Sequence, residues 1–148
     1  MNKQQLELAR RAVACDHWRW MEGIKVIVKF SADHEEFRLV RVKGKHSVLA
    51  VPLRLEQFNI DTLTEVGALP DLTDPATLGC LLHLVREAWG DPLARVERTN
   101  RFYTYDDRGT GCSARAWAVH IKTPPHLTRI PADTEIEALI NALEAAND

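Results

Sequence analysis

Residues 69–91, LPDLTDPATLGCLLHLVREAWGD, constrain the fold more than any other stretch, because they contain a helix with both a start and a stop signal. Asp74 is the predicted N-cap, since its carboxylate can accept hydrogen bonds from the free N–H groups of the first turn. Pro75 then takes the first helical position, where its missing N–H costs nothing. Gly90 is typical of the residue that ends a helix. The sequence therefore predicts one well-defined helix in the middle of the chain.

This helix has a wide apolar stripe. The residues that recur at helical spacing are Leu78, Leu81, Leu82, Val85 and Trp89. Leu84 and Ala88 widen the stripe, so we expect burial on more than one side. Cys80 and His83 are three residues apart, as a metal-binding pair requires, but a zinc site needs three or four ligands and no second pair completes one. A buried thiol beside a partly exposed imidazole is the simpler interpretation.

The length and composition indicate one cytoplasmic domain over residues 1–148. The chain is 45% hydrophobic and 27% charged, which is typical of a globular protein with its own core. No apolar run approaches the ~20 residues that span a bilayer, and the first residues lack the apolar segment of a secretory signal. The three cysteines are scattered and odd in number, which argues against a disulfide framework. We therefore expect a reducing compartment and no membrane contact.

The remaining pattern predicts an α+β fold in the order α-β-β-β-α-β-β-α. A first helix is expected at 2–15, and a final one after the capping-box pattern of Thr134 and Glu137, with Asp133 as an alternative cap. Strands are expected at 24–30, 37–42, 47–53, 93–105 and 115–121. The short turns favour a mainly antiparallel sheet of about five strands, packed with three helices. Residues 54–73 have no firm period, and their structure stays open at this point.

Two stretches contain candidate binding residues. Trp18 and Trp20 face the same way in extended backbone, and with Arg19 they could form a stacking and phosphate-contact patch. The alternative is that the two indoles cover the end of the core where the first helix meets the sheet.

The second stretch is the basic hairpin region at 25–45, which carries Lys25, Lys29, Arg38, Arg41, Lys43 and Lys45 and could contact phosphate or an acidic protein surface. Its candidate nucleic-acid contacts are Arg38, Arg41, Lys43 and Lys45. The alternative is a solvated strand face with lysines that protect an edge against aggregation. The formal net charge of -2 adds no overall field that would attract nucleic acid.

No pattern for catalysis is evident. The loop at 106–111, DDRGTG, could bind a cation through Asp106 and Asp107, but it lacks the spacing of known phosphate or calcium loops and suits an ordinary turn. The six histidines are scattered, and Cys112 has no neighbour that clearly lowers its pKa. The sequence therefore predicts no catalytic residue, metal or cofactor, and it favours a non-enzymatic protein.

Three blocks resemble a group of small uncharacterised phage and prophage proteins of the phage α/β/α (ABA) sandwich type. They are LARRAVACDHWRWMEG at 8–23, LPDLTDPATLGCLLHLVREAWGD at 69–91 and EIEALINALEAA at 135–146. The resemblance implies a phage or prophage origin, a life in the host cytoplasm and an α/β/α sandwich. It implies no activity, because the group brings no catalytic or binding residues with it. The basic segment at 24–58 has no counterpart in the group.

Together these observations favour a phage accessory protein of unknown function that binds a host or phage macromolecule, most readily a protein. Self-association through a sheet edge or a helix face is also compatible with the pattern. One alternative is a nucleic-acid-binding module that uses the basic hairpin, with affinity that falls steeply as salt rises. The other is a metal-dependent hydrolase that assembles histidine and aspartate residues from distant parts of the chain.

Overall fold

The chain divides into two compact units, and the division falls within helix α3 (Pro75–Ala88). The first unit comprises Met1–Ala14 and Trp18–Cys80, and the second comprises Cys15–His17 and Leu81–Asp148. The computed structural model describes the backbone of residues 1–30, 33–43, 46–51, 54–105, 111–123 and 126–146. It describes the side chains of residues 1–28, 35–42, 59–99, 117–122 and 127–146.

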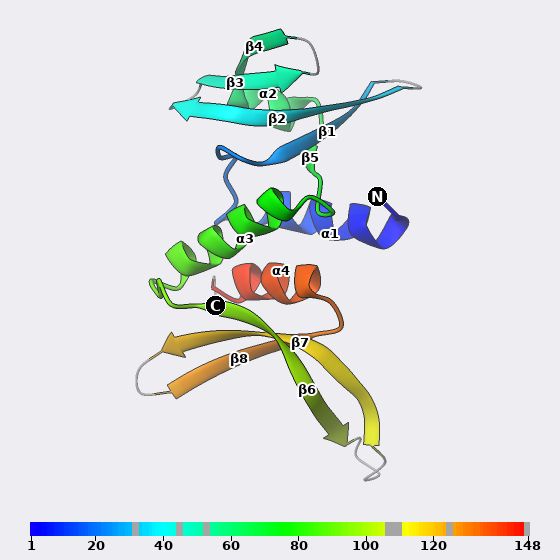
Figure 1. Cartoon of the computed structure of the whole chain (residues 1–148), viewed down its shortest axis with the longest axis vertical. Coiled ribbons are helices and arrows are strands. Elements are labelled where there is room, and N and C mark those ends of the chain that lie inside the picture. The colour runs from blue at the N-terminus through cyan, green and yellow to red at the C-terminus, as the bar shows by residue number, and fades with distance from the viewer. Residues whose placement is uncertain (31–32, 44–45, 52–53, 106–110, 124–125, 147–148) are drawn as a thin grey trace. The chain divides into compact units, whose positions relative to one another are not determined.

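The first unit is built on an antiparallel sheet of five strands in the order β4-β3-β2-β1-β5 (Figure 1). The strands are β1 (Lys25–Phe30), β2 (Asp33–Lys43), β3 (His46–Val51), β4 (Arg54–Asn59) and β5 (Leu69–Pro70). Consecutive strands from β1 to β4 pair with each other, as short hairpin connections allow. The two-residue strand β5 returns to the other side of β1, so β1 is an interior strand.

Helices α1 (Lys3–Ala14) and α2 (Ile60–Glu65) complete this unit. Its core contains the buried residues Trp20, Ile24, Val26, Val28, Phe37, Leu39, Leu63 and Ala68. Alternation on β1 explains part of this set, because Val26 and Val28 lie on one face of the strand. Helix α2 ends at Glu65 with Val66 as its C-cap, and the positive φ of Gly67, 67°, allows the amide of Ala68 to reach the carbonyl of Leu63.

Helix α3 begins and ends where its sequence predicts. The Asp74 carboxylate accepts a hydrogen bond from the amide of Thr77 at 2.9 Å, which confirms the N-cap. Gly90 has a φ of 60°, and the amide of Asp91 donates to the carbonyl of Arg86 in a Schellman motif. The buried face is rotated from the predicted stripe. It comprises Thr77, Leu81, Leu84 and Val85, while Leu78 and Leu82 are only partly buried.

The second unit contains a three-stranded antiparallel sheet in the order β6-β7-β8. Its strands are β6 (Arg95–Tyr105), β7 (Gly111–Thr123) and β8 (His126–Ala132). Helix α4 (Glu135–Ala145) packs across all three strands (Figure 1). Thr134 caps this helix by accepting from the amide of Glu137 at 3.1 Å, and the Glu137 carboxylate accepts from the amide of Asp133. The predicted start of the last helix is therefore confirmed.

The α+β class is confirmed, but the arrangement of the strands differs from the prediction. In the described part of the chain, eight strands form two sheets, where the sequence predicted about five strands in one sheet. Strands β4 and β5 and helix α2 occupy the stretch at 54–73 that had no clear period. Strand β8 was missed because Pro131 weakens a strand pattern, although proline is tolerated on an edge strand such as this one. The assignment of residues 1–148 to a single domain stays a prediction.

Candidate functional site

The segment between α1 and β1 places two tryptophans together in the first unit. Gly23 ends this segment with a φ of 98°, and its amide donates to the carbonyl of Leu39 at 2.8 Å. The turn at Gly23 thus fixes the segment to strand β2. The rings of Trp18 and Trp20 meet edge to face, with centroids 5.3 Å apart and an interplanar angle of 85°. This is a favourable geometry for two aromatic rings.

These tryptophans line an open pocket of about 580 Å³, which we call the tryptophan pocket. Its walls comprise Val13, Trp18, Arg19, Trp20, Met21, Glu22, Val42, Ile60 and Thr64. All three predicted contact residues of this stretch, Trp18, Arg19 and Trp20, are therefore together in one concave site. The volume lies in the range of small-molecule and side-chain pockets, and the lining combines aromatic, apolar and a few polar groups.

Both indoles also belong to the core, as the alternative interpretation of the sequence proposed. Trp20 is only 5% exposed and is a member of the buried cluster, and Trp18 packs against that cluster. The Nε1–H groups of both rings are buried and have no hydrogen-bond partner among the described residues. A buried donor without a partner costs roughly 1–3 kcal/mol.

A second hollow adjoins the tryptophan pocket and shares Val13 and Thr64 with it. This hollow has a volume of about 680 Å³ and runs along α1, the end of α2 and β5. Its lining includes the apolar residues Leu6, Val13, Ala14, Ile27, Ala68 and Leu69. The first unit therefore has two neighbouring hollows, one lined by the two tryptophans and one lined mainly by aliphatic side chains together with Arg10 and Thr64.

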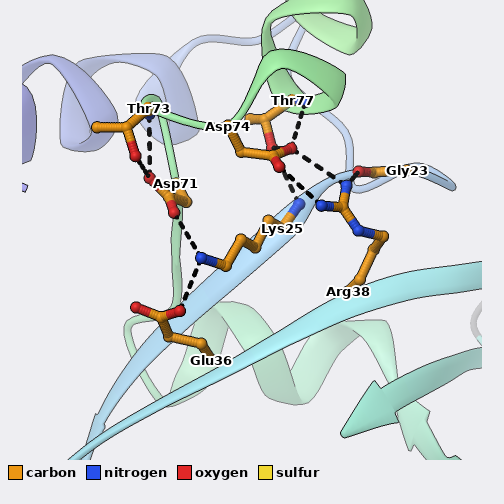
Figure 2. A network of polar contacts seen from close by, with 8 residues as sticks. All are labelled: Gly23, Lys25, Glu36, Arg38, Asp71, Thr73, Asp74 and Thr77. Carbon is orange, nitrogen blue, oxygen red and sulfur yellow. Dashed lines mark hydrogen bonds and ion pairs between the residues drawn. The ribbon is translucent and has the colours of Figure 1, made fainter. Parts of the chain in front are cut away.

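Arg38, a predicted nucleic-acid contact, lies in a network of polar contacts (Figure 2). Its guanidinium donates to both carboxylate oxygens of Asp74, at 3.1 and 2.7 Å, and to the carbonyl of Gly23 at 2.8 Å. Asp74 also accepts from the amide and the hydroxyl of Thr77. The Arg38 guanidinium therefore holds the pKa of Asp74 at about 2. To bind a phosphate, Arg38 would first have to leave this bidentate pair.

Lys25 extends the same network from strand β1. Its ammonium lies 2.7 Å from Glu36 and 3.0 Å from Asp71, and its amide donates to the hydroxyl of Thr77 (Figure 2). Burial opposes ionisation of Asp71, but hydrogen bonds from Thr73 and Lys25 outweigh it and lower the pKa of this carboxyl. We call Lys25, Glu36, Arg38, Asp71 and Asp74 the charge network. It joins β1 and β2 to the start of α3 and satisfies its own buried carboxylates.

The other predicted contacts of the basic hairpin are placed only in part. Arg41 is exposed on β2. The side chain of Lys43 and the whole of Lys45 lie outside the described residues, as do Asp106 and Asp107 of the predicted cation loop. The geometry thus brings Trp18, Arg19 and Trp20 into one site, and it places Arg38 in the charge network.

Cys80 and His83, the predicted pair on α3, contact different residues. The Cys80 thiol lies 3.4 Å from the carbonyl of Glu22, and burial, with a contribution from Asp74, raises its pKa. His83 faces Glu87, one turn further along α3, at 3.4 Å. Within the described ranges, no group of three or more histidine, cysteine, aspartate or glutamate side chains is arranged to hold a metal ion.

Sequence reasoning missed the residues that close the tryptophan pocket. Val42, Ile60 and Thr64 come from β2 and α2, far along the chain from the tryptophans. Val42 and Ile60 carry only apolar character as a sequence signal, which core residues share, and Thr64 carries no signal. Pocket walls of this kind arise from strand pairing and helix placement, and single-sequence patterns do not encode these directly.

Comparison with known proteins adds no relative from which a role could be transferred. No family model, curated protein or solved structure matches this chain. Among the described residues, no helix has both the length and the apolar character needed to cross a membrane. The resemblance to phage and prophage proteins therefore stays a prediction.

Proposed function

We propose that this chain is a non-enzymatic binding protein, and that the tryptophan pocket receives an apolar side chain of a partner protein. One observation carries the proposal: Trp18, Arg19 and Trp20 line a preformed pocket of about 580 Å³. Tryptophan and arginine are the residue types that most often dominate the binding energy of protein interfaces. The adjoining aliphatic hollow would extend the contact along the partner chain.

The resemblance to phage and prophage proteins supports a partner from the host or from the phage itself. Under this proposal the protein is a phage accessory protein that acts by occupying a macromolecular surface in the host cytoplasm. Arg38 and Lys25 belong to the charge network, so they support the fold, and the binding energy comes from aromatic and apolar contacts.

The test is a pull-down from host lysate with the tagged full-length chain, with and without nuclease treatment. We expect a stoichiometric protein partner that remains after nuclease. The variant Thr64→Trp fills the pocket from the exposed side of α2 and should abolish capture. The matched control Glu65→Trp adds the same side chain at the next exposed position, outside the pocket lining, and should retain it.

Two outcomes would contradict the proposal. Recovery of nucleic acid, or of partners that nuclease removes, would favour the basic hairpin as the binding surface. Equal capture by Thr64→Trp and the unchanged chain would show that the tryptophan pocket is not the contact. Circular dichroism of both variants distinguishes a lost contact from a lost fold.

A further inference from the structure

A second pocket lies on the three-stranded sheet of the other unit, and its residues come from paired positions on adjacent strands. Arg95 of β6 pairs with His120 of β7, and His120 pairs with Arg129 of β8. The next row contains Lys122 opposite Leu127. Because alternate residues of a strand point to the same side, these side chains share one face of the sheet. We call this site the His120 pocket.

The His120 pocket has a volume of about 140 Å³ and is lined by Leu93, Arg95, Glu97, His120, Lys122, Leu127 and Arg129. At about 30 Å³ for each water molecule of the liquid, it has room for roughly five waters, or for one small chemical group. His120 is its buried member, at 8% exposure. Leu93 and Leu127 are 66% and 55% exposed, so the pocket has an apolar part that is open to solvent.

The Nε2 atom of His120 is buried and has no hydrogen-bond partner among the described residues. The nearest oxygen is Oε2 of Glu97 at 3.6 Å, which is beyond hydrogen-bonding distance, and the other Glu97 oxygen pairs with Arg95. Burial, with Arg129 and Arg95, lowers the pKa of His120 against the opposing effect of Glu97. The imidazole is therefore neutral near pH 7, and one of its nitrogens can donate a hydrogen bond to an anion.

We propose that the His120 pocket binds a carboxylate group carried on a small apolar body. Three cationic side chains, those of Arg95, Lys122 and Arg129, line the pocket together with the buried imidazole, and Glu97, which pairs with Arg95, is the one carboxylate in its lining. A monoanion suits this balance better than a dianion, because Glu97 in the wall repels each added negative charge. The apolar part of the ligand would contact Leu93 and Leu127. The site uses residues and chemistry distinct from those of the tryptophan pocket.

The test is an NMR titration of the full-length chain with hexanoate, acetate, N-acetyl-leucine and inorganic phosphate as separate probes. We expect saturable shifts of the His120 ring signals with hexanoate and an increase in the His120 pKa, since a bound anion favours the charged imidazole. Hexanoate should bind tighter than acetate by about fourfold for each CH₂ group that leaves water. Tighter binding of N-acetyl-leucine than of hexanoate identifies a peptide C-terminus as the source of the carboxylate, and the reverse order identifies a free acid.

Matched variants separate a site from a general charge effect. Arg95→Gln removes a cation whose side chain is 64% exposed, and it should weaken hexanoate binding about tenfold. Arg98→Gln removes an exposed cation from the same strand, outside the pocket lining, and should leave binding unchanged. Equal losses in the two variants, phosphate binding as tight as hexanoate binding, or no saturable shift at His120 would each overturn the proposal.

Discussion

Buried polar atoms have hydrogen-bond partners in the charge network, whereas several in the tryptophan pocket and the His120 pocket have none among the described residues. In the network, Asp74 accepts four hydrogen bonds, and Asp71 accepts from Thr73 and pairs with Lys25. The buried side-chain nitrogens that lack a partner among the described residues are those of Trp18, Trp20 and His120, and all three residues line a pocket. The network thus holds partnered polar groups, and the two proposed binding sites contain the unpartnered ones.

The largest expected effect comes from breaking the network at its most connected member. Asp74→Ala removes the helix cap and leaves Arg38 without its carboxylate partner, so we expect a loss of about 3 kcal/mol in the free energy of unfolding. Urea-induced unfolding measures this. The control Asp133→Ala removes an exposed aspartate beside the N-terminus of α4 and should change stability by less than about 0.5 kcal/mol. Similar losses in both variants would contradict the assigned role of the network.

The second-largest expected effect is the loss of stability when acid protonates the charge network. The folded-state pKa of Asp74, about 2, lies below its ordinary value of 3.8, so the unfolded state binds more protons between these values. The contribution of this carboxyl is complete above about pH 4 and is lost as the pH falls towards 2. The shift corresponds to about 2 kcal/mol. The free energy of unfolding, measured from pH 5 to pH 2, should decline less steeply in the variant Arg38→Met than in the unchanged chain. An equally steep decline in both would show that the pairing of Arg38 with Asp74 is not the cause of the acid sensitivity.

Two tryptophans allow a direct comparison between an indole N–H with a hydrogen-bond partner and one without a partner among the described residues. The expected changes in stability are smaller than those above. Trp89 donates its Nε1–H to the carbonyl of Ala142 at 2.8 Å, whereas the Nε1–H of Trp20 has no partner among the described residues. Trp20→Phe should therefore cost only about 1 kcal/mol, and Trp89→Phe should cost about 2 kcal/mol. Chemical denaturation of the two variants decides the order. A larger loss for Trp20→Phe would mean that its indole nitrogen makes a contact after all.

The smallest expected effect concerns His120. Its folded-state pKa is lowered, mainly by burial, so protonation favours the unfolded state and stability declines as the pH falls below the ordinary histidine range. The variant His120→Gln should flatten the dependence of stability on pH between about 5 and 7. The unchanged chain is the reference, and an identical slope in His120→Gln would contradict the burial effect.

Local signals explain what could be predicted from the sequence. The caps at Asp74, Gly90 and Thr134 depend on residues within one helical turn, and all three were predicted correctly. The tryptophan pair was also accessible, because alternation in extended backbone places Trp18 and Trp20 on one side.

Long-range pairing explains what could not be predicted. The pairing of Arg38 with Asp74 is absent from the sequence prediction because Asp74 lies 36 residues away, and nucleic-acid contact by Arg38 stays a prediction. The pairing of β5 with β1 and the separation of the strands into two sheets depend on contacts across similar distances. No sequence pattern identifies His120 as a site residue, because the register between β6, β7 and β8 determines which side chains lie beside it.

Strand β5 has a consequence for how copies of this protein can associate. The amide of Asp71 points inward to the carbonyl of Lys25, so the nitrogen of the preceding residue, Pro70, points to the outer edge of the sheet. Proline has no N–H to offer there, and β5 is only two residues long. A chain that approached this edge would find almost nothing to pair with. The β5 edge therefore disfavours the addition of a further strand on this side of the sheet.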